Sequence, residues 1–205
     1  MFNVEDFGEL NDTPVVMEVP ADRLHEAVAK EVELAPSMEL QAKEIAEAFL
    51  EFPELNYENW KELCSEERLN VLQSFETEIA RIEHRDPLVV RQADLGQCVR
   101  GQCSWHTGEL LVNTDMLGSD SREDYVQSLT TFIHEGRHAY QFHNLYVEAV
   151  EPNKELLDSW HVNLDVLGYD SGDHIFFGFE KYYTQPIEVD ARVFAQATIK
   201  NMDLR

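Results

Sequence analysis

Apolar residues recur at helical spacing through the first part of the chain. They form a stripe in each of three segments, residues 21–35, 38–52 and 65–83. Residues three, four and seven positions apart share one side of an α-helix, so such a stripe marks the side that packs on a core. Many positions between the apolar ones are Glu. Residues 21–84 are therefore predicted to be helical, with acidic residues on the solvent side.

The pattern changes at residue 87. Up to residue 113 the apolar runs are short and are interrupted by glycines, which predicts two to four short strands. The most regular of these runs is Glu109–Asn113. A sheet built from such short strands is small, so it forms a minor part of the fold.

Three further helices are predicted after the strands. Ser121 precedes a long helical segment with acidic residues in its first turn, as expected of an N-cap. The next helix is predicted to end at Gly168, and the last to begin at Pro186, since proline suits the first helical turn. The expected fold is α+β, mostly helical, with a small antiparallel sheet next to the long helix. Residues 1–86 are expected to form a helical portion of unknown role, packed as one unit with a core of residues 87–205.

The composition narrows the choice of partners. The chain has 205 residues, and its 40 acidic and 16 basic residues give a formal net charge of −24. This charge argues against binding to nucleic acid or to an anionic membrane surface, because both need a basic surface. A basic protein or peptide would suit it better, and the oligomeric state stays open. The N-terminal sequence lacks the features of a signal peptide. We therefore expect a cytoplasmic protein, or one exported by a route without a cleavable signal peptide.

Two histidines stand four positions apart in the long helix, within the sequence TFIHEGRHAYQFH (residues 131–143). His134 and His138 are expected on one side of the helix with Cβ atoms roughly 5–6 Å apart. Two imidazoles so placed can share one zinc ion. Glu135 points away from that side, but it can still reach a water at the metal and act as a general base.

The spacing H-E-x-x-H is not decisive alone, because this composition produces it by chance in roughly one chain in 25. The surroundings support it. Glu109–Asn113 forms a short strand about 20 residues earlier, and edge strands bind extended peptides. A later helix carries Glu188 and Asp190, either of which could supply a third ligand. The alternative is a polar stripe on an ordinary surface helix.

The sequence HEGRH, followed some 50 residues later by EVDA, resembles the gluzincin branch of the zincin metallopeptidases. The wider arrangement, over roughly residues 100–200, is similar to small HExxH domains of bacterial toxins and effectors. The resemblance implies that His134, His138 and Glu188 bind Zn²⁺, one per chain, and that Glu135 is the general base. It also implies a substrate-binding edge strand formed by Glu109, Leu110, Leu111, Val112 and Asn113.

The sequence departs from the gluzincin pattern at one position. Some gluzincins place Asp four residues after the third ligand, where this chain has Arg192. Asp190 is the candidate to replace that second-shell carboxylate, or to be the ligand itself. Tyr183, beside Tyr182, is the candidate to donate a hydrogen bond to the oxyanion of the transition state. The alternative for both tyrosines is packing.

The predicted function is a zinc-dependent endopeptidase, of the toxin or effector type, that cleaves a protein or peptide with Glu135 as general base. The first alternative is a non-catalytic acidic module that binds a protein and has a structural or vestigial metal site. A second alternative is an acidic mimic of nucleic acid, whose function would not depend on His134.

Overall fold

The computed structural model describes residues 34–96, 99–170 and 178–204. The helix predicted over residues 21–35 lies almost wholly outside these ranges. In chain order the described elements are α2 (Pro36–Phe49), η2 (Pro53–Leu55), α3 (Tyr57–Trp60), α4 (Ser65–Ile82), β1 (Val89–Ala93), β2 (Gly101–Ser104), β3 (Glu109–Asn113), α5 (Thr114–Leu117), α6 (Arg122–Tyr146), α7 (Lys154–His161), η3 (Val162–Leu167), α8 (Gly178–Tyr183) and α9 (Pro186–Asn201).

The chain has a mostly helical α+β fold, as the sequence predicts. The described strands form one sheet in the order β1-β3-β2. β2 and β3 are antiparallel, whereas β1 and β3 are parallel, with Val89 opposite Glu109. The expectation of an antiparallel sheet is therefore wrong, because the hairpin of β2 and β3 joins β1 through its second strand.

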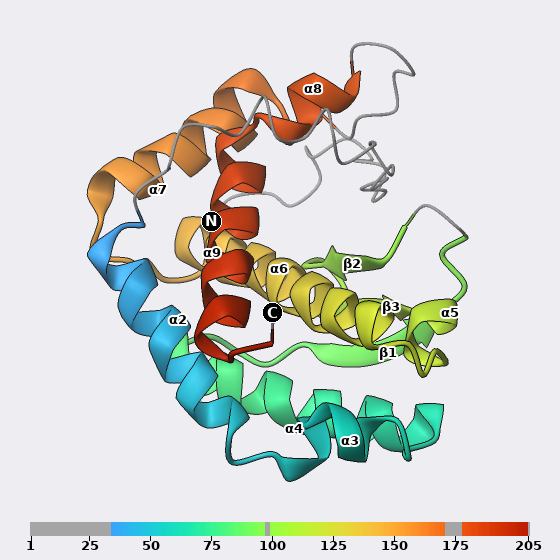
Figure 1. Cartoon of the computed structure of the whole chain (residues 1–205). Helices are drawn as coiled ribbons and strands as arrows, with labels where there is room; N and C mark the ends of the chain where they lie inside the picture. Colours follow the sequence, from blue (N-terminus) through green and yellow to red (C-terminus); the bar gives the residue numbers. More distant parts are fainter. Residues whose placement is uncertain (1–33, 97–98, 171–177, 205) are drawn as a thin grey trace.

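The long helix α6 covers one face of this sheet (Figure 1). Val90, Leu110 and Val112 are buried on that face. The opposite face carries half-exposed residues such as Val89, which is 46% exposed. This alternation is the usual pattern of a sheet with a single covered face.

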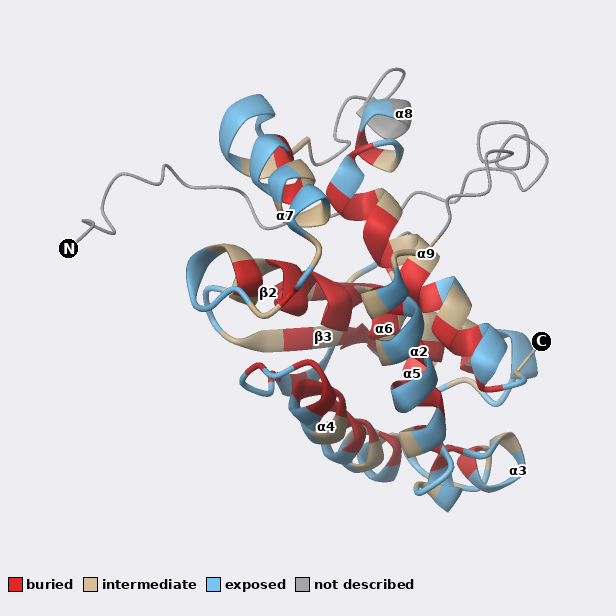
Figure 2. Cartoon of the chain, turned by 90° about the vertical axis from the view of Figure 1, so that its left-hand side faces the viewer, coloured by how far each residue is buried: buried red, intermediate tan, exposed pale blue. Residues whose placement is uncertain are grey.

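A single large apolar cluster joins the helices to the sheet. It includes Met38 of α2, Phe75 of α4, Phe132 of α6 and Phe194 of α9. Figure 2 shows the buried residues gathered along the sides of these helices that face one another. The residues before and after position 86 therefore share one core.

The helix boundaries follow from local signals in the sequence. The Ser121 side chain caps α6 by accepting a hydrogen bond from the Asp124 N–H, and Pro186 stands at the start of α9. After α7 the chain continues as the π-helical segment η3, which ends at Gly168 with φ 79°. Glycine adopts this left-handed backbone at no steric cost. These three predicted boundaries are confirmed.

Within the described ranges, no helix is both long enough and apolar enough to span a bilayer.

Candidate metal centre

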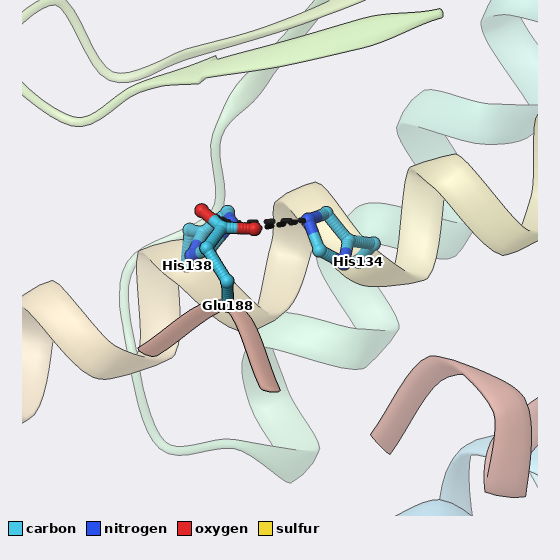
Figure 3. Close-up of side chains that lie close together, drawn as sticks. All are labelled: His134, His138 and Glu188. Carbon is cyan, nitrogen blue, oxygen red and sulfur yellow. Dashed lines mark hydrogen bonds and ion pairs between the residues drawn. The ribbon is translucent and has the colours of Figure 1, made fainter. Parts of the chain in front are cut away.

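Two histidines of α6 and one glutamate of α9 converge (Figure 3). The Nε2 atoms of His134 and His138 lie 3.2 Å apart. Glu188 places one carboxylate oxygen 3.4 Å from each of them. One ligand atom from each residue lies within 4.8 Å of the others, so a single ion can be held between them. The structure thus brings together the three residues predicted as metal ligands.

The position of Glu188 follows from the start of α9. It is in the first turn of the helix, where the partial positive charge of the free backbone N–H groups stabilises a carboxylate. Asn163 of the π-helical segment accepts a hydrogen bond from the Ile187 N–H, and its amide donates to the Gln185 side chain. These contacts fix the first turn of α9 and therefore the direction of Glu188.

The donor set fits a divalent transition metal. Two imidazoles and one carboxylate are typical zinc ligands. Glu188 is completely buried, yet its Oε2 atom makes no hydrogen bond. Buried polar atoms are nearly always paired, so such an atom beside two imidazole nitrogens indicates a place for a cation.

The charges in the site are strongly coupled. Burial alone would lower the pKa of His138, but the Glu188 carboxylate outweighs it and raises the pKa to about 9. Burial would raise the pKa of Glu188, whereas the two imidazoles, His138 foremost, hold it well below its ordinary value. Glu188 is therefore ionised, and His138 shares its Nε2 side with that negative charge.

Glu135 is also buried, with 1% of its surface exposed. Its Oε2 atom accepts a hydrogen bond of 2.9 Å from the Cys103 N–H of β2. Gly101 makes this approach possible, since a Cβ atom there would lie 2.6 Å from Thr131 Cγ2 and 3.3 Å from Glu135 Cγ. The general-base candidate thus stands between the histidine helix and the neighbouring strand.

The structure places tyrosines at the site, but not the one predicted. Tyr169 donates a hydrogen bond of 2.9 Å to Glu188 Oε1. Tyr182 lies against the Tyr169 ring, and its pKa is raised by burial and by Glu188. The Tyr183 ring instead lies under the Arg192 guanidinium, 3.6 Å from ring centroid to Cζ. The oxyanion role predicted for Tyr183 has no support in this geometry.

Asp190 lies behind the histidines and is not part of the ligand cluster. It accepts hydrogen bonds from Arg137 Nε, at 2.9 Å, and from Gln141 Nε2, at 2.6 Å. Gln141 in turn lies 2.8 Å from His138 Nδ1. The second-shell position predicted for Asp190 is thus reached through a glutamine.

Arg192 also lies near the site, with Nη1 3.9 Å from Glu188 Oε2. Burial lowers the pKa of its guanidinium, against the attraction of Tyr183 and Glu188. The position where some gluzincins have Asp therefore contributes a positive charge here.

The prediction that β3 is an edge strand is wrong. β3 is the central strand and is hydrogen-bonded on both sides, so its backbone cannot take up a peptide. Leu110 and Val112 are core residues, and Glu109 forms an ion pair with Arg91. The Asn113 side chain caps α5. β2 is the strand that contacts the histidine helix at Glu135.

Two residues of the site have no part in the sequence-based prediction. Gln141 follows His138 by three positions, so helical spacing alone could have placed it beside the histidine. Tyr169 follows Gly168 outside any predicted helix, and no spacing signal relates it to Glu188.

No protein-family model matches the chain, and comparisons with curated proteins and with solved structures found no significant match.

Proposed function

We propose that the chain is a zinc-dependent endopeptidase. The observation that carries this proposal is the convergence of His134, His138 and Glu188 beside a buried carboxylate, Glu135, of the same helix. The resemblance to gluzincins in the sequence HEGRH and in EVDA also supports it. Fold alone is no argument for function, so the proposal depends on the geometry of these four side chains.

A zinc ion, when bound, supplies Lewis acidity, which makes a water molecule more acidic and polarises the substrate carbonyl. The protein supplies the proton transfers. Glu135 Oε2 is held by the Cys103 N–H, so Oε1 is the oxygen that takes the proton from water. The same carboxylate then returns the proton to the leaving amine.

The charge of the chain points to a class of substrate. With a formal net charge of −24, the chain would repel acidic targets and attract basic ones. We therefore propose a protein or peptide substrate with Lys or Arg near the cleaved bond, cut by a protease of the toxin or effector type.

The second candidate function is a binding module with a structural metal site. The burial of Glu135 and Glu188, at 1% and 0% exposed, favours it, because structural sites are closed to solvent. The two candidates differ in whether Glu135 takes part in turnover.

The test combines metal analysis with a cleavage assay. We expect about one zinc per chain by elemental analysis, and loss of zinc from the His134→Ala and Glu188→Ala variants. The control is His161→Ala, because His161 is exposed and pairs only with Asp165 in the described structure. Zinc that remains in Glu188→Ala would contradict the ligand set.

The cleavage assay uses a mixed peptide library that includes basic sequences. Glu135→Gln is expected to keep zinc and the fold but to lose activity about 10²- to 10⁴-fold, as for other general bases. Wild-type protein that holds zinc and cleaves nothing in the library would favour the structural site. Full activity in Glu135→Gln would refute the role of Glu135.

A further inference from the structure

Gln141 is completely buried between His138 and the start of α9. Its side-chain amide has three polar neighbours. Nε2 lies 2.9 Å from the Ile187 carbonyl oxygen and 2.6 Å from Asp190 Oδ2. Oε1 lies 2.8 Å from His138 Nδ1. The sequence gives Gln141 no chemical role, so these contacts need an explanation.

The neighbours of Gln141 fix the orientation of its amide. A backbone carbonyl and an ionised carboxylate can only accept hydrogen bonds. If the amide were rotated by 180°, Oε1 would face two acceptors at these distances with no proton between them. The amide nitrogen must therefore face Ile187 and Asp190, and the amide oxygen must face His138.

The orientation of Gln141 in turn fixes the proton on His138. An amide oxygen has lone pairs only, so the hydrogen bond to it requires a proton on His138 Nδ1. The neutral imidazole then carries its lone pair on Nε2, the atom that lies 3.4 Å from Glu188. This is the tautomer that a metal ligand needs at that position.

Asp190 is itself held by a buried cation. Arg137 donates to both carboxylate oxygens, at 2.9 and 3.4 Å. Its own position is fixed by a hydrogen bond to Gln41 of α2 and by the Tyr140 and Phe194 rings, each 4.4 Å from ring centroid to Cζ. Arg137 and Gln141 are four positions apart on one side of α6, which lets both reach Asp190.

We propose that Gln141 is a positioning residue of the metal centre, which sets the Nδ1–H tautomer of His138 and aims its Nε2 lone pair at a divalent transition-metal ion. This inference rests on the metal site of the proposed function. It also makes the two histidines unequal. No residue in the described ranges forms a hydrogen bond with His134 Nδ1, so His134 is placed by its neighbours in the site alone.

The experiment measures the histidine nitrogens directly. Protein labelled with ¹⁵N-histidine is studied by long-range ¹H–¹⁵N correlation NMR, with zinc and after zinc removal. We expect an Nδ1–H of His138 that exchanges slowly with water in both states, and zinc on Nε2 of the same ring. Zinc on Nδ1 of His138 in the wild-type protein would overturn the proposal without any variant.

Variants then separate positioning from packing. Gln141→Met keeps the volume but loses the amide, and it is expected to lose the slowly exchanging proton and to weaken zinc binding about 10- to 100-fold. The combination of Gln141→Glu with Asp190→Asn restores an acceptor for His138 and exchanges the charge. It is expected to recover most of the zinc affinity.

The matched control is Gln73→Met in α4. Gln73 also makes two hydrogen bonds to the backbone, to the Leu88 carbonyl and from the Val90 N–H, but it lies outside the site. Its loss is expected to change stability but neither zinc affinity nor the His138 signals.

The outcomes distinguish the two proposals. Wild-type protein that binds no zinc would overturn the proposed function, and the positioning role with it. Wild-type protein that binds zinc, with Gln141→Met unchanged in affinity and in its His138 Nδ1–H signal, would overturn the positioning role alone.

Discussion

The backbone N–H of Cys103 donates to the Glu135 side chain over 2.9 Å, and this bond joins strand β2 to helix α6 at the candidate site. Gly101 is the residue that allows it. Because the strand and the helix approach so closely, a small side chain at that position disturbs both the fold and the general-base candidate.

Gly101→Ala is expected to destabilise the protein by about 1–3 kcal/mol, as for other overpacked sites. The added Cβ atom would lie 2.6 Å from Thr131 Cγ2 and 3.1 Å from the Leu111 carbonyl oxygen. Urea unfolding measures the loss. Thr131→Ser removes the closest contact atom, so the Gly101→Ala/Thr131→Ser pair should lose less than the sum of its parts. Simple additivity would mean that the two elements do not press on each other there.

Arg137→Met is expected to cost about 3–5 kcal/mol, because it leaves Asp190 buried without its cation. Both side chains are almost fully buried, at 0% and 3% exposed. Guanidinium unfolding is the measurement. The control is Lys154→Met, which breaks an exposed ion pair with Asp158 and should cost at most about 1 kcal/mol. Equal losses in the two variants would contradict a special role for the buried pair.

Glu83 gives a pH-dependent test. Burial raises the pKa of its carboxyl above the ordinary 4.5, against the attraction of Arg85 and Arg137. The folded chain therefore binds this proton more tightly than the unfolded chain. Its contribution to stability is full below the ordinary pKa and is lost as the pH rises through the folded value. Glu83→Gln resembles the neutral acid, so its stability relative to wild type should increase with pH above 4.5.

The control for Glu83 is on the same helix. The Arg81 side chain lowers the pKa of Glu78 through their hydrogen bonds. Glu78→Gln should therefore lose stability relative to wild type as the pH rises, the opposite sign. Urea unfolding at several pH values between 4 and 8 compares the two. Parallel pH curves for Glu83→Gln and wild type would show that Glu83 is ionised in the fold.

Tyr169 and Tyr183 are distinguished by their hydroxyl groups. Tyr169→Phe removes the hydrogen bond to Glu188, and in a working metal site the loss of such a partner lowers affinity or activity about 10- to 100-fold. Tyr183→Phe keeps the ring on Arg192 and should change neither. Zinc titration and the peptide assay are the measurements. A larger loss in Tyr183→Phe would restore the tyrosine that the sequence alone favours.

The features of the fold that were predicted from the sequence depend on local signals. The Ser121 cap, the Pro186 start and the apolar stripe of α4 each act within a few residues, so they can be recognised one segment at a time. The pairing of β3 with β1 depends instead on which strand of the hairpin meets a strand formed 20 residues earlier. Spacing in one segment carries no information about such a choice.

The same difference explains the site. His134 and His138 are related by helical spacing, and Glu188 by its resemblance to a known pattern, so all three could be named in advance. Tyr169 reaches Glu188 only because η3 ends at Gly168 and turns the chain back. That contact depends on tertiary packing, and the residue itself looks like any loop tyrosine.

The third ligand and the partner of Arg137 both stand on α9. During synthesis, α6 leaves the ribosome about 50 residues before α9 does. A growing chain that has reached only α8 therefore has two histidines without their carboxylate and a buried arginine without its counter-ion. The ligand set can be completed only when α9 has docked on α6, so metal loading of this site has to follow nearly the whole of translation.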